Sequence, residues 1–230
     1  MSIYGFIISF AILTCLLLGE KRIATKDIGF YWNLALVTII SGLIGARVYH
    51  VIDFWGYYSA DPIKVLYFWR GGLGIWGGII GAFICSSLYI KLKKERLVYW
   101  LDLMAGILPL GQAIGRWGNF FNQENFGYPT TLPWGIYINS VPGQKFHPLF
   151  LYESLLSLIL FLILNKFTRG SGKVIVLYLF GYSVIRFFLE FLRIDPWIIN
   201  DINVAQFVSV VVTLLCALYL IRPRWFQSKK

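Results

Sequence analysis

The sequence predicts an all-α integral membrane protein, a bundle of about seven transmembrane helices. Hydrophobic residues make up 58% of the 230 residues and charged residues only 14%, and the mean hydropathy is +0.68. A water-soluble domain carries about a quarter charged residues. The apolar residues also fall into stretches near the ~20 residues that an α-helix needs to cross a bilayer. Composition and spacing together therefore exclude an ordinary soluble domain.

Seven stretches are candidates for these helices. Four contain no Lys, Arg, Asp or Glu: Ile3–Gly19, Ile28–Ala46, Gly71–Ile90 and Val204–Ile221. The other three hold isolated charges, namely Asp102, Glu153, and Arg186 with Glu190: Leu97–Ile114, Pro148–Leu164 and Val174–Arg193. We expect residues 1–230 to form a single transmembrane catalytic domain with a short outer loop region, 115–147, that makes at most a small outer loop domain.

The distribution of basic residues predicts how the helices are oriented. Fourteen of the 21 Lys and Arg residues lie in the loops after the first, third and fifth helices and in the C-terminal tail. Basic residues are enriched in cytoplasmic loops, so these fourteen predict a cytoplasmic C-terminus and an N-terminus outside. The net charge of +10 then indicates contact with membrane lipids of the cytoplasmic leaflet rather than with nucleic acid.

Polar residues are concentrated in one segment, Gly115–Gly127, which holds Arg116, Asn119 and Glu124. Polar groups at membrane depth are costly, so they suggest function. A guanidinium is a planar fork of donors that suits a lipid phosphate. The orientation places this segment and Arg186 toward the outer leaflet. We therefore interpret the segment as the candidate active site.

A second polar group lies in the span Val174–Arg193, where Tyr182, Arg186, Glu190 and Arg193 share one helical face. That face should point into the bundle. Simpler interpretations remain for some charges: Glu190 pairs with a neighbouring arginine, and Arg47 and Arg193 reach lipid headgroups from helix ends. Asp102 is interpreted as a structural cap or as a partner of the basic cluster 91–96. The G-x-x-x-G pairs of residues 74–81 indicate either close helix packing or a groove for an acyl chain.

Metal and thiol chemistry have no sequence support. Cys15, Cys85 and Cys216 lie far apart inside apolar stretches, with no metal-ligand spacing and no disulfide framework. No cluster of His, Cys and Asp resembles a zinc or iron site. We therefore expect no metal and no cofactor, and we expect the three cysteines to be small buried hydrophobic residues.

The run G-R-W-G-N-F-F-N-Q-E-N-F-G at Gly115–Gly127 resembles the signature of the bacterial prolipoprotein diacylglyceryl transferase family. The resemblance extends over nearly the whole chain. It includes these further segments: Tyr4-Gly5, Gly45-Ala46-Arg47, Gly71-Gly72-Leu73, Gly77-Gly78, Asp102, His147-Pro148, Leu151-Tyr152-Glu153, Gly181-Tyr182, Arg186, Glu190-Phe191, Arg193 and Gln206.

Membership would imply transfer of the sn-1,2-diacylglyceryl group from phosphatidylglycerol to the lipobox cysteine of a prelipoprotein, with release of glycerol phosphate. Phosphatidylglycerol would be a substrate rather than a cofactor, and prelipoprotein signal peptides would be the partners. The resemblance implies catalytic roles for Arg116, Arg186, Glu124 and Asn119. It implies substrate binding by a partly overlapping set: Arg116, Tyr4, Gly127, Tyr182, Glu190 and His147.

The resemblance also implies a multi-pass protein of the bacterial inner membrane with its active site toward the outer leaflet. The chain departs from the family in one respect that matters for catalysis. Many members have a histidine where this chain has Trp76, and an indole cannot accept the thiol proton. Two alternatives stay open at this stage, a membrane transporter and a lipid-binding protein. A transporter would, however, favour an internal repeat and polar groups near the midplane.

Overall fold

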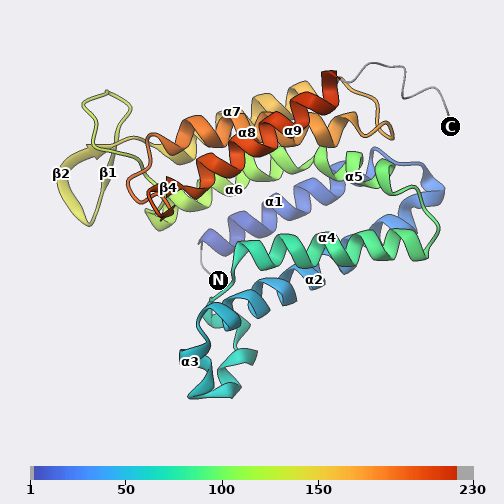
Figure 1. Cartoon of the computed structure of the whole chain (residues 1–230), viewed down its shortest axis with the longest axis horizontal. Helices are drawn as coiled ribbons and strands as arrows, with labels where there is room; N and C mark the ends of the chain where they lie inside the picture. Colours follow the sequence, from blue (N-terminus) through green and yellow to red (C-terminus); the bar gives the residue numbers. More distant parts are fainter. Residues whose placement is uncertain (1–2, 222–230) are drawn as a thin grey trace. The chain divides into compact units, whose positions relative to one another are not determined.

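The computed structural model describes residues 3–221, and of Arg70 only the backbone. The chain is mostly helical and divides into two compact units, which we describe separately. One contains residues 20–100, and the other joins residues 3–19 to residues 101–221. Figure 1 shows the course of the helices. The predicted all-α class is confirmed, because the only sheets are two-stranded hairpins within the described residues.

The unit of residues 20–100 is built on two long helices, α2 (Ile28–Asp53) and α4 (Ile75–Leu92). Short helical turns precede α2 or connect it to α4: η1 (Thr25–Asp27), α3 (Trp55–Ser59), η2 (Pro62–Leu66) and η3 (Phe68–Arg70). The two long helices pack through glycines. A Cβ atom added to Gly77 would collide with the Gly45 carbonyl oxygen, and one added to Gly81 would lie 2.6 Å from the Ser41 carbonyl oxygen. This backbone contact confirms that the glycines serve close helix packing.

Arg47 organises the connection between these helices. Its guanidinium is buried and donates hydrogen bonds to backbone carbonyls that all follow α2, those of Lys64, Val65, Tyr67, Gly71 and Gly72. An arginine with five N–H donors can satisfy several carbonyls of an irregular segment at once. The interpretation of Arg47 as a side chain that reaches lipid headgroups is therefore wrong, since the irregular backbone occupies its donors.

The other unit gathers α1 (Ile3–Glu20) with the helices of the second half of the chain, which run alongside one another in Figure 1. In order, these are α5 (Leu97–Ala105), α6 (Leu108–Asn122), α7 (Leu149–Leu164), α8 (Lys173–Glu190) and α9 (Val204–Ile221). Two hairpins interrupt them, β1–β2 (Ile136–Ile138 and Val141–Phe146) and β3–β4 (Ile198–Ile199 and Ile202–Asn203). Helices α6 and α7, α7 and α8, and α8 and α9 are in contact.

Several predicted boundaries differ from the structure. Helix α2 continues to Asp53, past the predicted Ala46, and α4 begins at Ile75 rather than at Gly71. The expected span Leu97–Ile114 is broken between α5 and α6, where Pro109 lies in the first turn of α6 and needs no hydrogen-bond donor of its own. Helix α6 then continues to Asn122, eight residues past the predicted end, so much of the polar segment is helical. Helix α8 ends at Glu190, which leaves Arg193 outside the helix.

Asp102 is the cap of a helix far away in the sequence. Its side chain is fully buried, and Oδ2 accepts the backbone N–H groups of Gly170, Ser171 and Gly172 while Oδ1 accepts that of Ile175. These groups form the loop before α8 and its first turn, where unpaired N–H groups and the helix dipole favour a negative charge. The cap interpretation is thus confirmed, and Asp102 fixes the start of α8.

Among the residues that the structure describes, five segments are long and apolar enough to cross a membrane: Ile3–Glu20, Thr25–Asp53, Ile75–Leu92, Leu97–Asn122 and Val204–Ile221. Helix α7 is apolar but shorter, with 16 residues, and α8 carries charged residues. Each predicted span therefore overlaps at least one helix, and the chain has the character of a multi-pass membrane protein. The number of crossings, the orientation and the single-domain organisation stay predictions.

Candidate active site

The end of α6 positions the first group of predicted site residues. Arg116 and Asn119 lie three residues apart on the same helical face, and Arg116 Nη1 is 3.4 Å from Asn119 Oδ1. The helix ends with Gln123 in a left-handed conformation, which turns the chain back over the last turn. The Asn119 amide then donates to Glu124 Oε1 at 2.9 Å. The signature thus forms a local polar loop closed by three of its own side chains.

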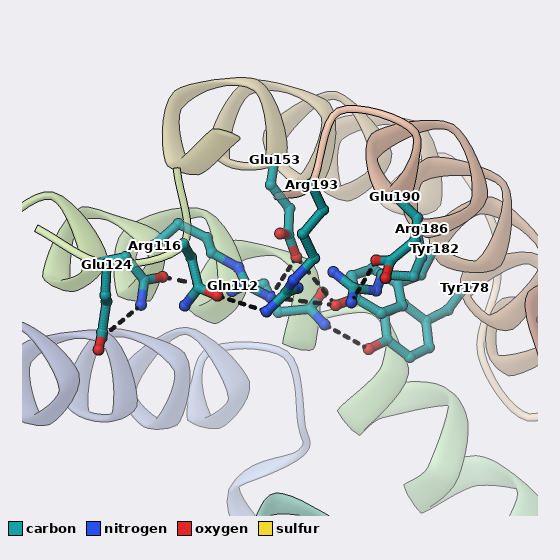
Figure 2. A network of polar contacts seen from close by, with 11 residues as sticks. Gln112, Arg116, Glu124, Glu153, Tyr178, Tyr182, Arg186, Glu190 and Arg193 are labelled. Atoms are coloured by element: carbon teal, nitrogen blue, oxygen red, sulfur yellow. Dashed lines mark hydrogen bonds and ion pairs between the residues drawn. The ribbon is translucent and has the colours of Figure 1, made fainter. Parts of the chain in front are cut away.

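Arg116 is held by side chains from two other helices. Its Nη2 lies 2.5 Å from Oε1 of Glu153 on α7, and the Tyr182 hydroxyl on α8 donates to the same oxygen at 3.0 Å (Figure 2). The Glu153 side chain is 7% exposed and that of Arg116 is 26% exposed. A buried carboxylate needs such partners, because its charge would otherwise be costly. Arg116 is therefore held in place while part of its side chain stays accessible.

A second arginine repeats this arrangement on α8. Arg186 Nη2 lies 2.7 Å from Oε2 of Glu190, one turn further along the helix. Glu190 is almost fully buried, and its other oxygen is 3.4 Å from the amide nitrogen of Asn203. Within residues 3–221, the pair with Glu190 is the one ion pair of Arg186 and uses one end of its guanidinium. The remaining N–H groups are donors that an anionic ligand could accept.

Gly127 marks a close crossing of three segments. Its N–H donates to the His147 carbonyl, and the next residue, Tyr128, donates its N–H to the Leu192 carbonyl. A Cβ atom at position 127 would lie 2.6 Å from the Leu192 carbonyl oxygen and 2.9 Å from the His147 Cβ atom. A glycine is therefore required for packing, which gives a physical reason for its place in the signature.

Arg193 fastens this crossing to the signature. Its Nη2 donates to Oδ1 of Asn125 at 2.7 Å. The Arg193 side chain is therefore directed to the signature loop. This contact does not support the interpretation that Arg193 reaches lipid headgroups. Asn125 itself has a positive φ of 55°, which asparagine tolerates better than most residues. The α8 end and the signature loop are thus held as one structure.

Tyr4 and His147 lie at the edges of the arginine network. Tyr4 on α1 packs against Gly118 of α6, where an added Cβ atom would be 2.8 Å from its ring. His147 Nδ1 is 3.2 Å from the hydroxyl of Tyr152, which also accepts the indole N–H of Trp134 at 2.9 Å. No hydrogen bond joins either residue to Arg116 or Arg186 in the described part of the chain.

Glu153 was not among the predicted site residues, although it bonds to both Arg116 and Tyr182 in the network. A lone carboxylate inside the apolar run Pro148–Leu164 was the signal that could have found it. Two further members, Gln112 and Tyr178, also went unpredicted; they are joined by a hydrogen bond of 3.0 Å and appear beside Arg116 and Tyr182 in Figure 2.

The chemistry of the site is that of paired cations with spare donors. Arg116 on α6 and Arg186 on α8 each pair with a buried glutamate, and both pairs belong to the polar network of Figure 2. Such an arrangement can hold a phosphate and stabilise charge that develops on a leaving oxygen. Within residues 3–221 no group of three or more His, Cys, Asp and Glu side chains could hold a metal ion.

Comparison with known proteins identifies the family. The model of the prolipoprotein diacylglyceryl transferase family matches residues 1–222, almost the whole chain. The chain belongs to this family. As a member of the prolipoprotein diacylglyceryl transferase family it is a transferase of lipoprotein modification, and the helices above agree with a membrane enzyme.

Curated relatives agree with the family match. A protein of Fervidobacterium nodosum is 40% identical over 93% of this chain and 78% of its own length. One of Thermotoga maritima is 39% identical over 92% of this chain and 75% of its own length. One of Prochlorococcus marinus is 35% identical over 98% of this chain and 90% of its own length. All three are named phosphatidylglycerol–prolipoprotein diacylglyceryl transferase.

Proposed function

We propose that this prolipoprotein diacylglyceryl transferase takes its diacylglyceryl group from phosphatidylglycerol and attaches it to the lipobox cysteine of a prelipoprotein signal peptide. The observation that carries the proposal is the pair of oriented arginines, Arg116 with Glu153 and Arg186 with Glu190. The names of the relatives support phosphatidylglycerol as the donor. The alternatives of a transporter and a lipid-binding protein are not favoured by any contact of the site.

The proposed reaction is a displacement at the glyceryl carbon next to the phosphate. The thiolate of the substrate cysteine forms a C–S bond to that carbon, the C–O bond to phosphate breaks, and glycerol phosphate leaves with the bonding electrons. Negative charge therefore develops on a phosphate oxygen. The unpaired N–H donors of Arg116 and Arg186 would stabilise this charge. Their hydrogen bonds strengthen as the charge develops, so they stabilise the transition state more than the bound substrate.

The other site residues would support these arginines. Glu153 orients Arg116, and the Tyr182 hydroxyl holds Glu153. Asn119 and Glu124 would close the signature loop around the lipid phosphate, and Glu190 would orient Arg186. For Tyr4 and His147 we propose contacts with substrate at the periphery. The chemistry needs no cofactor, since the thiol comes from the substrate.

We further propose that the enzyme lies in the bacterial inner membrane with this site toward the outer leaflet. The bias of basic residues toward one side supports that orientation. It would place the arginines where a lipobox cysteine emerges after export of the signal peptide.

A reconstituted assay tests the proposal. Purified protein, phosphatidylglycerol vesicles and a lipobox peptide should yield a peptide whose mass has increased by one diacylglyceryl group. Arg116→Lys and Arg186→Lys keep the charge but lose the fork, so each should lower the rate about 10²-fold. Arg96→Lys, at an exposed loop position, is the matched control and should retain full activity. Near-normal rates for both site variants would refute the proposed roles.

A further inference from the structure

One polar pair lies beside the arginine network without belonging to it. Gln112 on α6 and Tyr178 on α8 are joined by a bond of 3.0 Å from the amide nitrogen to the phenol oxygen. Gln112 is one helical turn before Arg116, and Tyr178 is one turn before Tyr182, whose ring stacks on that of Tyr178 at 6.0 Å. The pair is thus built on the same two helices as the site (Figure 2).

The pair has hydrogen-bonding capacity left over. Gln112 Oε1 is buried and has no partner, and the phenol of Tyr178 accepts the Gln112 bond but donates none within the described residues. One amide hydrogen of Gln112 is also unused. Two donors therefore remain available to a ligand, one amide hydrogen of Gln112 and the phenol hydrogen of Tyr178.

The position of the pair indicates which ligand group it meets. The segment Leu97–Asn122 is one of the candidate membrane spans, and Gln112 lies nearer its middle than Arg116 does. One turn corresponds to ~6 Å along the helix. In a phospholipid the ester carbonyls are a few covalent bonds from the phosphorus and lie on its acyl side, toward the bilayer centre. An ester carbonyl is a hydrogen-bond acceptor without a donor, which matches the spare donors of the pair.

We propose that Gln112 and Tyr178 bind an ester carbonyl of the diacylglyceryl group that is transferred. This inference rests on the proposed function, because it assumes that Arg116 holds the lipid phosphate. It makes the pair a determinant of donor specificity: the enzyme would distinguish ester-linked from ether-linked glycerolipids. The pair would also hold the glyceryl carbon at a fixed distance from the arginines.

The experiment measures transfer from two lipids by the wild type, by one site variant and by one control variant. The lipids are diacyl phosphatidylglycerol and its dialkyl ether analogue, which keeps the headgroup and the chains but lacks both carbonyls. The enzymes are the wild type and Tyr178→Phe, which keeps the ring and removes the donor. Tyr219→Phe, on the exposed part of α9, is the matched control. The measured quantity is kcat/KM for transfer to a lipobox peptide.

One lost hydrogen bond corresponds to about a threefold to tenfold change. We expect the wild type and Tyr219→Phe to prefer the diacyl lipid by that factor, and Tyr178→Phe to use both lipids at the lower rate. If Tyr178→Phe lowers the rates with both lipids equally, its role is structural and the proposal is wrong. The proposal is also wrong if an active Tyr178→Phe enzyme keeps the wild-type preference for the diacyl lipid over the ether lipid.

A third lipid tests whether the acceptor oxygen belongs to the headgroup instead of the acyl esters. A diacyl lipid with propanediol in place of the headgroup glycerol keeps the carbonyls and lacks one hydroxyl. The wild type prefers diacyl phosphatidylglycerol to this lipid if it binds the missing hydroxyl. If Tyr178→Phe loses that preference but keeps the preference over the ether lipid, the pair binds the headgroup and the proposal is overturned. Absence of transfer from diacyl phosphatidylglycerol by the wild type would instead refute the proposed function.

Discussion

Replacing Asp102 with asparagine should destabilise the protein without touching the arginine network. The carboxylate accepts four backbone N–H groups from the loop before α8 and from its first turn, and its side chain has no exposed surface. An asparagine in the best orientation keeps its oxygen on the three loop N–H groups. Its NH₂ group then faces the N–H of Ile175, so that donor is left without an acceptor.

The magnitude follows from these contacts. Hydrogen bonds to a charged group contribute ~1.5–3 kcal/mol, neutral ones ~0.5–1.5 kcal/mol, and a buried donor without a partner costs ~1–3 kcal/mol. The variant loses one bond outright and the charge of the acceptor in the other three. Because such terms are not additive, we expect a total loss of about 2–4 kcal/mol in the free energy of unfolding.

The assay is thermal unfolding of the purified protein in detergent, with transfer activity measured in parallel below the transition. Asp61→Asn is the matched control, since Asp61 forms only a partly exposed pair with Lys64 at 3.5 Å and should change stability little. We expect a lowered unfolding temperature for Asp102→Asn and transfer activity in the fraction that stays folded. A variant that unfolds like the wild type yet has lost activity would refute the structural role of Asp102.

Three further predictions concern other parts of the chain. Gly127→Ala should lower both stability and transfer because its Cβ atom would collide with a backbone carbonyl, whereas Gly29→Ala, with nothing within 4 Å, should be neutral or slightly stabilising; thermal unfolding and the transfer assay compare them. A cysteine at Tyr57, which is 56% exposed while its neighbour Tyr58 is buried, should be labelled from outside the cell by a membrane-impermeant thiol reagent. Labelling only after permeabilisation would contradict the proposed orientation. A variant without the three cysteines should transfer at a normal rate, and EDTA should not inhibit; loss of activity in the folded variant, or inhibition, would require a different mechanism.

The class of the protein and the position of its helices were predictable because both depend on local composition. The last helix has the predicted bounds, Val204–Ile221, and the first differs by one residue. In each case an uninterrupted apolar run sets the helix, and length alone identifies it. The broken span at residues 105–108 was not predictable in this way, because hydropathy stays high through the break.

Contacts between distant segments account for what the sequence did not predict. Asp102 finds its partners 68 to 73 residues away, and Glu153 meets Arg116 from another helix. Arg47 resembles an arginine at a helix end, yet its donors are used by a backbone segment whose irregular course no pattern indicates. The motif brought Arg116, Asn119 and Glu124 together because their contacts are local: the first two lie on the last turns of α6, and Glu124 follows Asn119 by five positions.

The surroundings of His147 bear on which group accepts the thiol proton. His147 Nδ1 is 3.2 Å from the hydroxyl of Tyr152, which also accepts the indole N–H of Trp134. In either tautomer this contact occupies Nδ1, and no hydrogen bond joins His147 to Arg116 or Arg186 within residues 3–221. The field of two arginines, in contrast, lowers the pKa of a nearby thiol directly. We therefore expect the substrate cysteine to react as a thiolate that the arginines stabilise, which is compatible with Trp76, whose indole cannot accept a proton.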